Sequence, residues 1–146
     1  MWPYTDAETM FLQPAEPRGE LAARTLAMPA DTNPSGDIFG GWIMSLMDAA
    51  GAVTATRRAG GRVVTAAAAV SFLRPVKVGD VVCCYAELRA VGRTSLSLGI
   101  EVWVLRQAQG SRTKVTEGEF TFVALAADGT PRRLTASGHN DVPEPS

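Results

Sequence analysis

The chain has 146 residues, of which 46% are apolar and 20% charged, a balance typical of a globular domain with one hydrophobic core. Its 14 basic and 15 acidic residues give a net charge of −1, which argues against a nucleic-acid partner and against a membrane-surface partner. No apolar run reaches the roughly 18 residues that span a bilayer, and residues 1–13 lack the basic and apolar segments of a secretory signal. We therefore expect a cytoplasmic protein.

The predicted elements follow one another in a simple order. Residues 1–19 show no periodicity and predict a loose arm, residues 21–28 predict a short strand or helix, and turn-forming residues fill 31–36. Gly40 and Gly41 open a long helix that ends near Arg58, before two further glycines. The hydrophobic period then changes to that of strands, which are predicted at 62–73, 81–91, 94–105 and 113–126. A mobile polar tail at 135–146 leaves a single domain at 20–134.

The predicted helix is apolar around nearly its whole circumference, so we expect it to be buried on all sides. Asp48 interrupts it, and a carboxylate inside a core must be paired, hydrogen-bonded or neutralised. A single sheet of this size is unable to cover such a helix fully, and an unpaired edge strand favours association. The pattern therefore predicts a dimer.

Asp48 and the glycine pair have a catalytic interpretation. Backbone N–H groups at a helix start have no partners within the helix and lie at the positive end of its dipole, so Gly40 and Gly41 can stabilise an oxyanion. Asp48, two turns later, can act as general base on a water or attack a carbonyl itself. A structural role for Asp48, capping a loop or pairing with an arginine across the dimer, is equally supported by the helix alone.

Other catalytic apparatus is scarce. The single histidine, His139, lies in the predicted tail, which argues against a Ser/His/Asp triad. No cluster of His, Cys, Asp and Glu has metal-ligand spacing, so we expect no metal and no cofactor. Cys83 and Cys84 are adjacent in a predicted strand, where successive side chains point to opposite faces. This favours two buried, inert thiols.

Five longer sequence segments, taken together and in order, resemble a known family. They are T-L-A-M-P-A-D-T-N-P-S-G-D-I-F-G-G-W-I-M-S-L-M-D at 25–48, G-R-V-V-T at 61–65, F-L-R-P-V-K-V-G-D-V-V-C-C-Y at 72–85, V-G-R-T-S at 91–95 and I-E-V-W-V at 100–104. In this order they resemble the hotdog-fold acyl-CoA thioesterases, specifically the YciA-like branch. The resemblance extends over roughly residues 21–134.

The resemblance implies an α+β hotdog fold, with a long helix wrapped by an antiparallel sheet, protomers paired edge to edge and a further assembly into trimers of dimers. It implies hydrolysis of acyl-CoA at the dimer interface, with Asp48 as acid/base or nucleophile, Gly40 and Gly41 as oxyanion donors and Asn33 as a further polar site residue. Coenzyme A would be substrate and product, not a cofactor. The coenzyme-binding positions it implies are Arg62, Val63, Val64, Thr65, Gly92, Arg93, Thr94 and Ser95.

Three questions stay open from the sequence. Arg93 is either a phosphate contact or a solvated turn residue, with equal support. Between Thr65 and Pro75 the chain is one residue shorter than is usual in the family, and a one-residue change flips side chains across a strand, so a shifted bulge or a shortened strand is expected there. A non-catalytic acyl-CoA-binding protein is the functional alternative, against which the intact Asp48 argues. A hotdog dehydratase is disfavoured, because Phe39 stands where those enzymes generally have a histidine.

Overall fold

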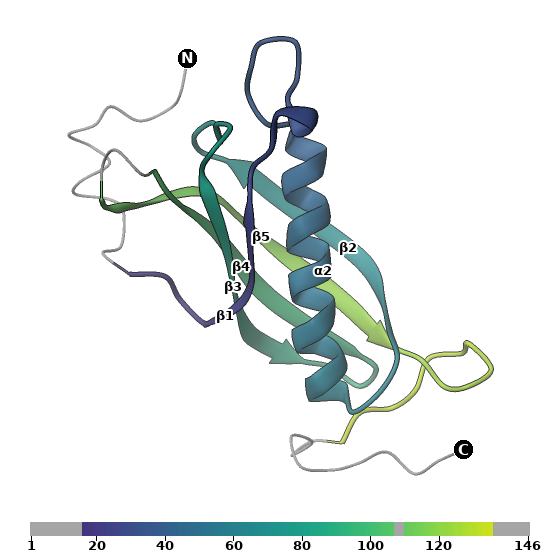
Figure 1. The fold of residues 1–146 in the computed structure, drawn as a ribbon. Helices are drawn as coiled ribbons and strands as arrows, with labels where there is room; N and C mark the ends of the chain where they lie inside the picture. The colour runs from purple at the N-terminus through teal and green to yellow at the C-terminus, as the bar shows by residue number, and fades with distance from the viewer. Residues whose placement is uncertain (1–15, 107–109, 136–146) are drawn as a thin grey trace.

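The structure is a computed structural model that describes residues 16–106 and 110–135. It consists of one long helix and a five-stranded antiparallel sheet (Figure 1), which confirms the expected α+β architecture. Most of the predicted arm at 1–19, nearly all of the predicted tail at 135–146, and His139 lie outside the described residues. None of the described helices is long and apolar enough to cross a membrane.

The elements lie close to their predicted positions. The single-turn helix η1 and the long helix α2 precede most of the sheet, and Gly60 ends α2 at a φ of +69°, in the left-handed region that glycine favours. The residues at 21–28, for which strand and helix were both open, form a strand. The bounds are β1 Glu20–Leu26, η1 Pro29–Asp31, α2 Gly40–Ala59, β2 Val63–Phe72, β3 Val81–Val91, β4 Ser95–Leu105 and β5 Arg112–Ala124.

The sheet has the order β1-β3-β4-β5-β2, and all neighbouring strands are antiparallel. Strand β2 therefore lies at an edge and pairs only with β5, where Val63 lies opposite Ala124. Most β2 side chains are exposed. The register shifts between Thr65 and Ala67, so the structure has a bulge at this point within a strand of 10 residues.

Helix α2 packs across one face of the sheet and contacts all five strands (Figure 1). A Cβ added at Gly51 would lie 2.8 Å from Ile100 Cδ1 and 2.9 Å from Phe122 Cζ, so the glycine permits a close approach of helix and sheet. The buried side of the helix consists of Ile43, Met47, Ala50, Gly51, Ala55 and Ala59.

The opposite side of α2 is open to solvent in the protomer. Val53 on this side is 51% exposed, and Met44, on the flank of the helix near its start, is 38% exposed. The expectation that the helix is buried on all sides is therefore wrong for a single chain, because one sheet covers only one side of a helix. An apolar surface of this kind is typical of a face that a partner covers.

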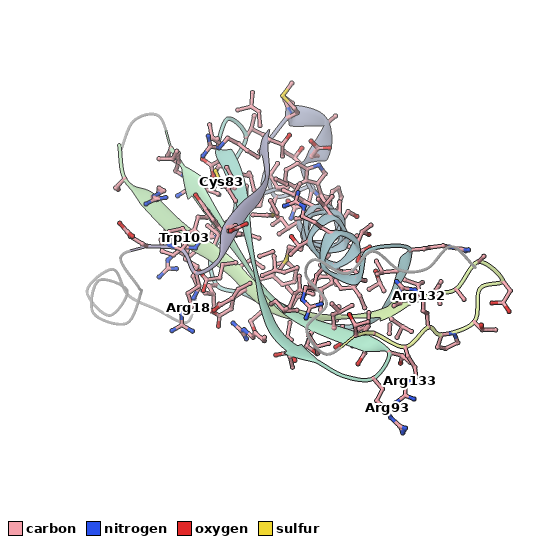
Figure 2. The ribbon with its side chains drawn as sticks, turned by 90° about the horizontal axis from the view of Figure 1, so that it is seen from below. Arg18, Cys83, Arg93, Trp103, Arg132 and Arg133 are labelled. Carbon is pink, nitrogen blue, oxygen red and sulfur yellow. The ribbon has the colours of Figure 1, made fainter. Side chains whose placement is uncertain are left out.

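The two cysteines point to opposite faces of β3, as the alternation of side chains predicts. Cys84 belongs to the core beneath α2, whereas Cys83 packs with Tyr85 and Trp103 on the far face (Figure 2). Both thiols are buried and free, which confirms that part of the prediction. Burial of the thiol raises the pKa of Cys84 to about 12, and the neighbouring Cys83 contributes a smaller part of this rise.

Candidate active site

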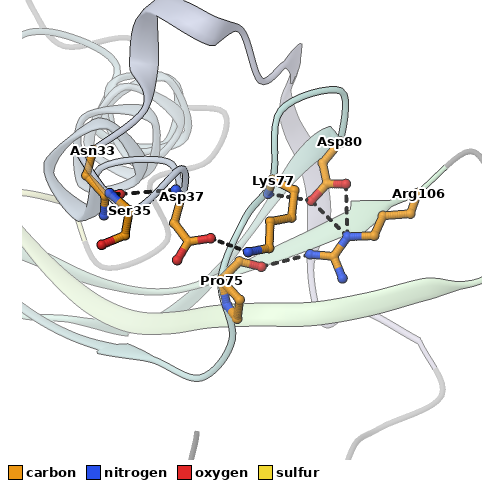
Figure 3. Close-up of polar contacts among 7 residues, drawn as sticks. All are labelled: Asn33, Ser35, Asp37, Pro75, Lys77, Asp80 and Arg106. Atoms are coloured by element: carbon orange, nitrogen blue, oxygen red, sulfur yellow. Dashed lines mark hydrogen bonds and ion pairs between the residues drawn. The ribbon is translucent and has the colours of Figure 1, made fainter. Parts of the chain in front are cut away.

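A folded loop positions the start of α2. The Asn33 Oδ1 accepts hydrogen bonds from the backbone N–H of Ser35 at 2.9 Å and of Asp37 at 3.1 Å (Figure 3). The loop closes where the Phe39 N–H donates to the Asp31 carbonyl at 3.0 Å. Asn33 therefore stabilises the turn with its side-chain oxygen, in the way that asparagine commonly does.

A network of paired charges anchors this loop to the sheet (Figure 3). The Asp37 carboxylate pairs with Lys77, whose backbone N–H donates to Asp80 Oδ2 at 2.9 Å. The Arg106 guanidinium donates to both Asp80 oxygens, at 3.0 and 3.2 Å, and to the Pro75 carbonyl at 2.8 Å. Asp80 is only 2% exposed, and its pairing offsets the desolvation cost of its carboxylate. This network was not expected from the sequence.

The first amides of α2 are available to a ligand. The preceding Phe39 provides no side-chain cap, and no described residue accepts a hydrogen bond from the N–H of Gly40 or Gly41. A Cβ at Gly40 would lie 3.2 Å from the Phe72 ring, whereas one at Gly41 would meet nothing within 4 Å. Packing within the protomer thus explains the glycine at 40 but not the one at 41. Both N–H groups lie at the positive end of the helix dipole.

Asp48 lies half-buried on the same helix. Its Oδ1 accepts a hydrogen bond of 2.5 Å from Thr65 Oγ1 on β2, next to the bulge. Asp48 makes no ion pair with any residue in the described part of the chain. Thr65, which the resemblance implies as a coenzyme contact, thus also fixes the orientation of the Asp48 carboxylate, a role that no local sequence signal revealed.

The helix start and Asp48 are too far apart to act on one carbonyl group within a single protomer. Asp48 follows Gly40 by eight positions, which at a rise of about 1.5 Å per residue separate the two residues by about 12 Å along α2. A base and an oxyanion donor must each lie about 3 Å from the reacting atoms. One protomer therefore presents the parts of a site without completing it.

The two segments expected to bind coenzyme A lie together at one end of the sheet. Val123 of β5 pairs with Val64 of β2 on one side and with Ser95 of β4 on the other. The Ala124 N–H donates to the Thr94 carbonyl at 2.8 Å. Sequence positions about 30 residues apart are thus separated by a single strand.

The turn before β4 presents Arg93 to solvent. The Gly92 N–H donates to the Ser95 carbonyl at 2.7 Å, which closes the turn. The Leu134 N–H donates to the Arg93 carbonyl at 2.7 Å, which brings the C-terminal part of the chain beside this turn. Arg133 lies next to Arg93 (Figure 2) and was not among the residues expected from the sequence.

Metal-ligating side chains do not gather in the described ranges 16–106 and 110–135. No group of three or more His, Cys, Asp and Glu residues there could hold a metal ion. The chemistry available to the site is that of a carboxylate, a hydroxyl and backbone N–H groups.

Comparison with known proteins gives concordant matches. Residues 35–111 match the model of the Thioesterase superfamily. The acyl-CoA thioester hydrolase YciA of Salmonella typhimurium is 57% identical over 126 residues, which cover 84% of this chain and 95% of that protein. A hexameric broad specificity acyl-coenzyme A thioesterase, solved as an aspartate-to-alanine mutant, is 48% identical with a TM-score of 0.80 and matches over 86% of this chain and 93% of that one.

A third match is more distant. An acyl-CoA hydrolase from Staphylococcus aureus, solved in complex with butyryl coenzyme A, is 31% identical with a TM-score of 0.73 over 77% of this chain and 69% of that one. Its aspartate-to-alanine and asparagine-to-alanine mutants have also been solved. The two mutated positions in that protein are separated by the same number of residues as Asn33 and Asp48 are here.

Proposed function

The chain belongs to the Thioesterase superfamily and adopts the hotdog fold, and from this premise we propose that it hydrolyses acyl-CoA thioesters to a free carboxylic acid and coenzyme A. The observation that supports this most is the Asp48 carboxylate, which Thr65 orients on a helix whose first amides have no partner among the described residues. This arrangement occurs in a chain 57% identical to an acyl-CoA thioester hydrolase.

In the proposed reaction, Asp48 acts as general base or as nucleophile. As a base, it takes a proton from a water whose oxygen bonds to the thioester carbon, and the proton then passes to the departing thiolate as the C–S bond breaks. As a nucleophile, it forms an anhydride with release of the thiol, and water then hydrolyses the anhydride. In both routes the N–H groups of Gly40 and Gly41 stabilise the negative charge on the carbonyl oxygen.

The distance along α2 requires two protomers for one complete site. We infer that Gly40 and Gly41 of one chain face Asp48 of another, because one helix separates these groups by about 12 Å. The exposed apolar side of α2 and the free edge of β2 provide the surfaces for such a dimer. The hexameric state given for a solved relative supports a further assembly of dimers.

The remaining expected residues have supporting roles in this proposal. The Asn33 side-chain oxygen is used within its loop, so its amide N–H₂ is the part that can reach a substrate. The segments on either side of the end of β5 would contact the coenzyme along its length. They are Arg62, Val63, Val64 and Thr65 on one side and Gly92, Arg93, Thr94 and Ser95 on the other.

Thiol release from acyl-CoAs with chains from acetyl to palmitoyl tests the proposal. We expect Asp48→Asn and Asp48→Ala to lower kcat about 1,000-fold, the order of magnitude of a lost general base, with an unchanged circular dichroism spectrum. Ser45→Ala, at an exposed polar position of the same helix, is the matched control and should keep the wild-type rate.

Near wild-type turnover in either Asp48 variant would remove Asp48 from the mechanism. Binding of coenzyme A without hydrolysis of any chain would favour the non-catalytic alternative. Single turnover in oxygen-18 water separates the two routes, since label in Asp48 indicates the anhydride and label only in the product indicates attack by water.

A further inference from the structure

The loop that precedes α2 rests on a neighbouring turn of the chain. This loop, residues 32–39, leads directly into the first turn of the helix. The Ile38 N–H donates to the Val76 carbonyl at 2.9 Å, and an isolated β-bridge at the adjacent positions extends the contact. Both Ile38 and Val76 are buried. The position of the helix start therefore depends on the support turn, defined as residues 75–80.

One arginine joins the two ends of the support turn, which lies between β2 and β3 (Figure 3). The Asp80 carboxylate accepts a hydrogen bond from the Lys77 N–H at 2.9 Å, and the Asp80 N–H donates to the Lys77 carbonyl at 3.1 Å. The Arg106 Nε donates to both Asp80 oxygens, at 3.0 and 3.2 Å, while its Nη2 donates to the Pro75 carbonyl at 2.8 Å. A single guanidinium thus holds the first and the last residue of the turn.

This attachment is buried and specific in geometry. Asp80 is 2% exposed, so loss of a bonded partner leaves its charge uncompensated in the interior. The planar guanidinium of Arg106 reaches a carboxylate and a backbone carbonyl at once, which the point charge of a lysine does less well. A change at Arg106 is therefore expected to displace the support turn and the loop that rests on it.

Arg106 lies far from Asp48 of its own chain. Thr65, which holds Asp48, lies opposite Phe122, and Phe122 lies opposite Leu96 of β4. Arg106 follows Leu96 by ten positions, which at roughly 3.3 Å per residue is about 30 Å along the strand. The part of the proposed site that Arg106 supports is therefore the helix start, not the carboxylate of the same protomer.

We propose that Arg106 and Asp80 are positioning residues for the oxyanion donors, because they fix the first amides of α2 through the support turn. The inference rests on the proposed function, in which these amides complete a site with Asp48 of the partner subunit. Donors preorganised at a developing charge lose much of their effect when they are displaced, and a shift of about 1 Å can cost about 100-fold in rate. Arg106 thus acts on catalysis without touching the substrate.

Steady-state kinetics of acyl-CoA hydrolysis test the role of Arg106. We expect Arg106→Ala to lower kcat about 100-fold and to leave KM within about 2-fold, as for an interaction used only in the transition state. Arg106→Lys keeps the charge and should lower kcat about 10-fold, and it replaces the alanine variant if that variant does not fold. A wild-type kcat, or a raised KM at unchanged kcat, would overturn the proposal.

The matched control is Arg112→Ala. Arg112 lies opposite Leu105 at the same end of the sheet, and its Nη1 donates to the Tyr85 hydroxyl at 3.3 Å instead of to the support turn. This variant should keep the wild-type kcat. An equal loss of kcat in Arg106→Ala and Arg112→Ala would overturn the proposal, because it would indicate a general effect of losing an arginine at this end.

Mixed dimers test which site Arg106 serves. Refolding equal amounts of Arg106→Ala and Asp48→Asn together gives dimers in which one site combines an intact helix start with an intact Asp48. We expect the mixture to recover about a quarter of the wild-type kcat, since half of the dimers are mixed and one of their two sites is intact. No recovery, with mixed dimers present by native mass spectrometry, would overturn the proposal.

Amide hydrogen exchange tests the positioning without any turnover. Exchange in residues 32–43 should be about 10-fold faster in Arg106→Ala than in the wild type, because the loop opens more often without its support. Residues 50–59 of the same helix should exchange as in the wild type. Unchanged exchange in residues 32–43 would overturn the positioning role. A wild type that hydrolyses no acyl-CoA would instead refute the proposed function, so the two failures are distinguishable.

Discussion

The two sides of α2 are similar in composition and opposite in environment. The side toward the sheet is closed, with Gly51 in near contact with Ile100, whereas Val53 on the outer side and Met44 on the flank are exposed. Apolar side chains on both sides would be unexpected if the protomer functioned alone. The difference teaches that a hydrophobic pattern shows which surfaces are to be covered without showing which chain covers them.

The largest expected effect on the stability of the protomer lies on the closed side. Gly51→Leu should lower the free energy of unfolding by about 2 kcal/mol or more, because the new side chain has no space beneath the helix and overpacking outweighs the gain in helix propensity. Urea unfolding measures the change. Thr56→Leu, at an exposed position of α2, should unfold near the wild-type midpoint. Equal stability of all three proteins would mean that the two sides of the helix do not differ in packing.

Val53→Asp tests the open side. A carboxylate placed in an apolar interface costs several kcal/mol if it is unpaired, so we expect the dimer dissociation constant to rise about 100-fold or more. Analytical ultracentrifugation gives the assembly state, and circular dichroism should show an intact fold. The same substitution at the exposed Val78, outside the helix, is the control. An unchanged assembly would place the partner surface elsewhere.

Thr65→Val examines the boundary between the two sides, where Asp48 meets β2. The substitution keeps the shape of the side chain and removes the hydroxyl that donates to the carboxylate. We expect kcat to fall about 10-fold, as for one charge-assisted hydrogen bond, with a stability change below about 1 kcal/mol. Thr65→Ser retains the donor and should recover most of the rate, which a purely steric role of Thr65 would not explain.

The effect that is smallest at neutral pH reports whether water reaches the closed side. Burial raises the pKa of Cys84 to about 12, so the folded thiol keeps its proton while the unfolded thiol ionises near pH 9. The unfolded state therefore binds fewer protons in this window, and the free energy of unfolding contributed by this thiol falls as pH rises from about 9 toward about 12. Urea unfolding at several pH values, compared with Cys84→Ala, measures the contribution. If the free energy of unfolding fell equally with pH in the wild type and in Cys84→Ala, water would reach the Cys84 thiol.

Local patterns predicted the elements but not their order in space. Strand β3 occupies its predicted range, and even the alanine run of β2 forms a strand despite its weak propensity, because β5 pairs with it. The edge position of β2 was not predictable, since the partner of a strand depends on the packing of the whole sheet. The apolar pattern of α2 likewise does not show that the sheet of the same chain covers only one side of the helix.

The candidate site shows the same limit. Asp48 is recognisable because it is a charged residue in an otherwise apolar helix. The glycine pair is recognisable because it stands at the start of that helix. The contact between Thr65 and Asp48 joins positions 17 residues apart on two elements, and the hydrogen bond from the Leu134 N–H to the Arg93 carbonyl joins two more distant segments. Neither of these two hydrogen bonds follows from a periodicity or a spacing that could be recognised in the sequence.

The edge position of β2 also constrains the order in which the chain can fold during synthesis. Helix α2 and β2 leave the ribosome early, but β2 has no strand to pair with until β5 follows. Val63, for example, pairs with Ala124, which is 61 residues later in the chain. Until then the helix has no complete sheet to pack on, and its apolar side chains remain in water. Folding of this domain is therefore completed only after β5 has been made.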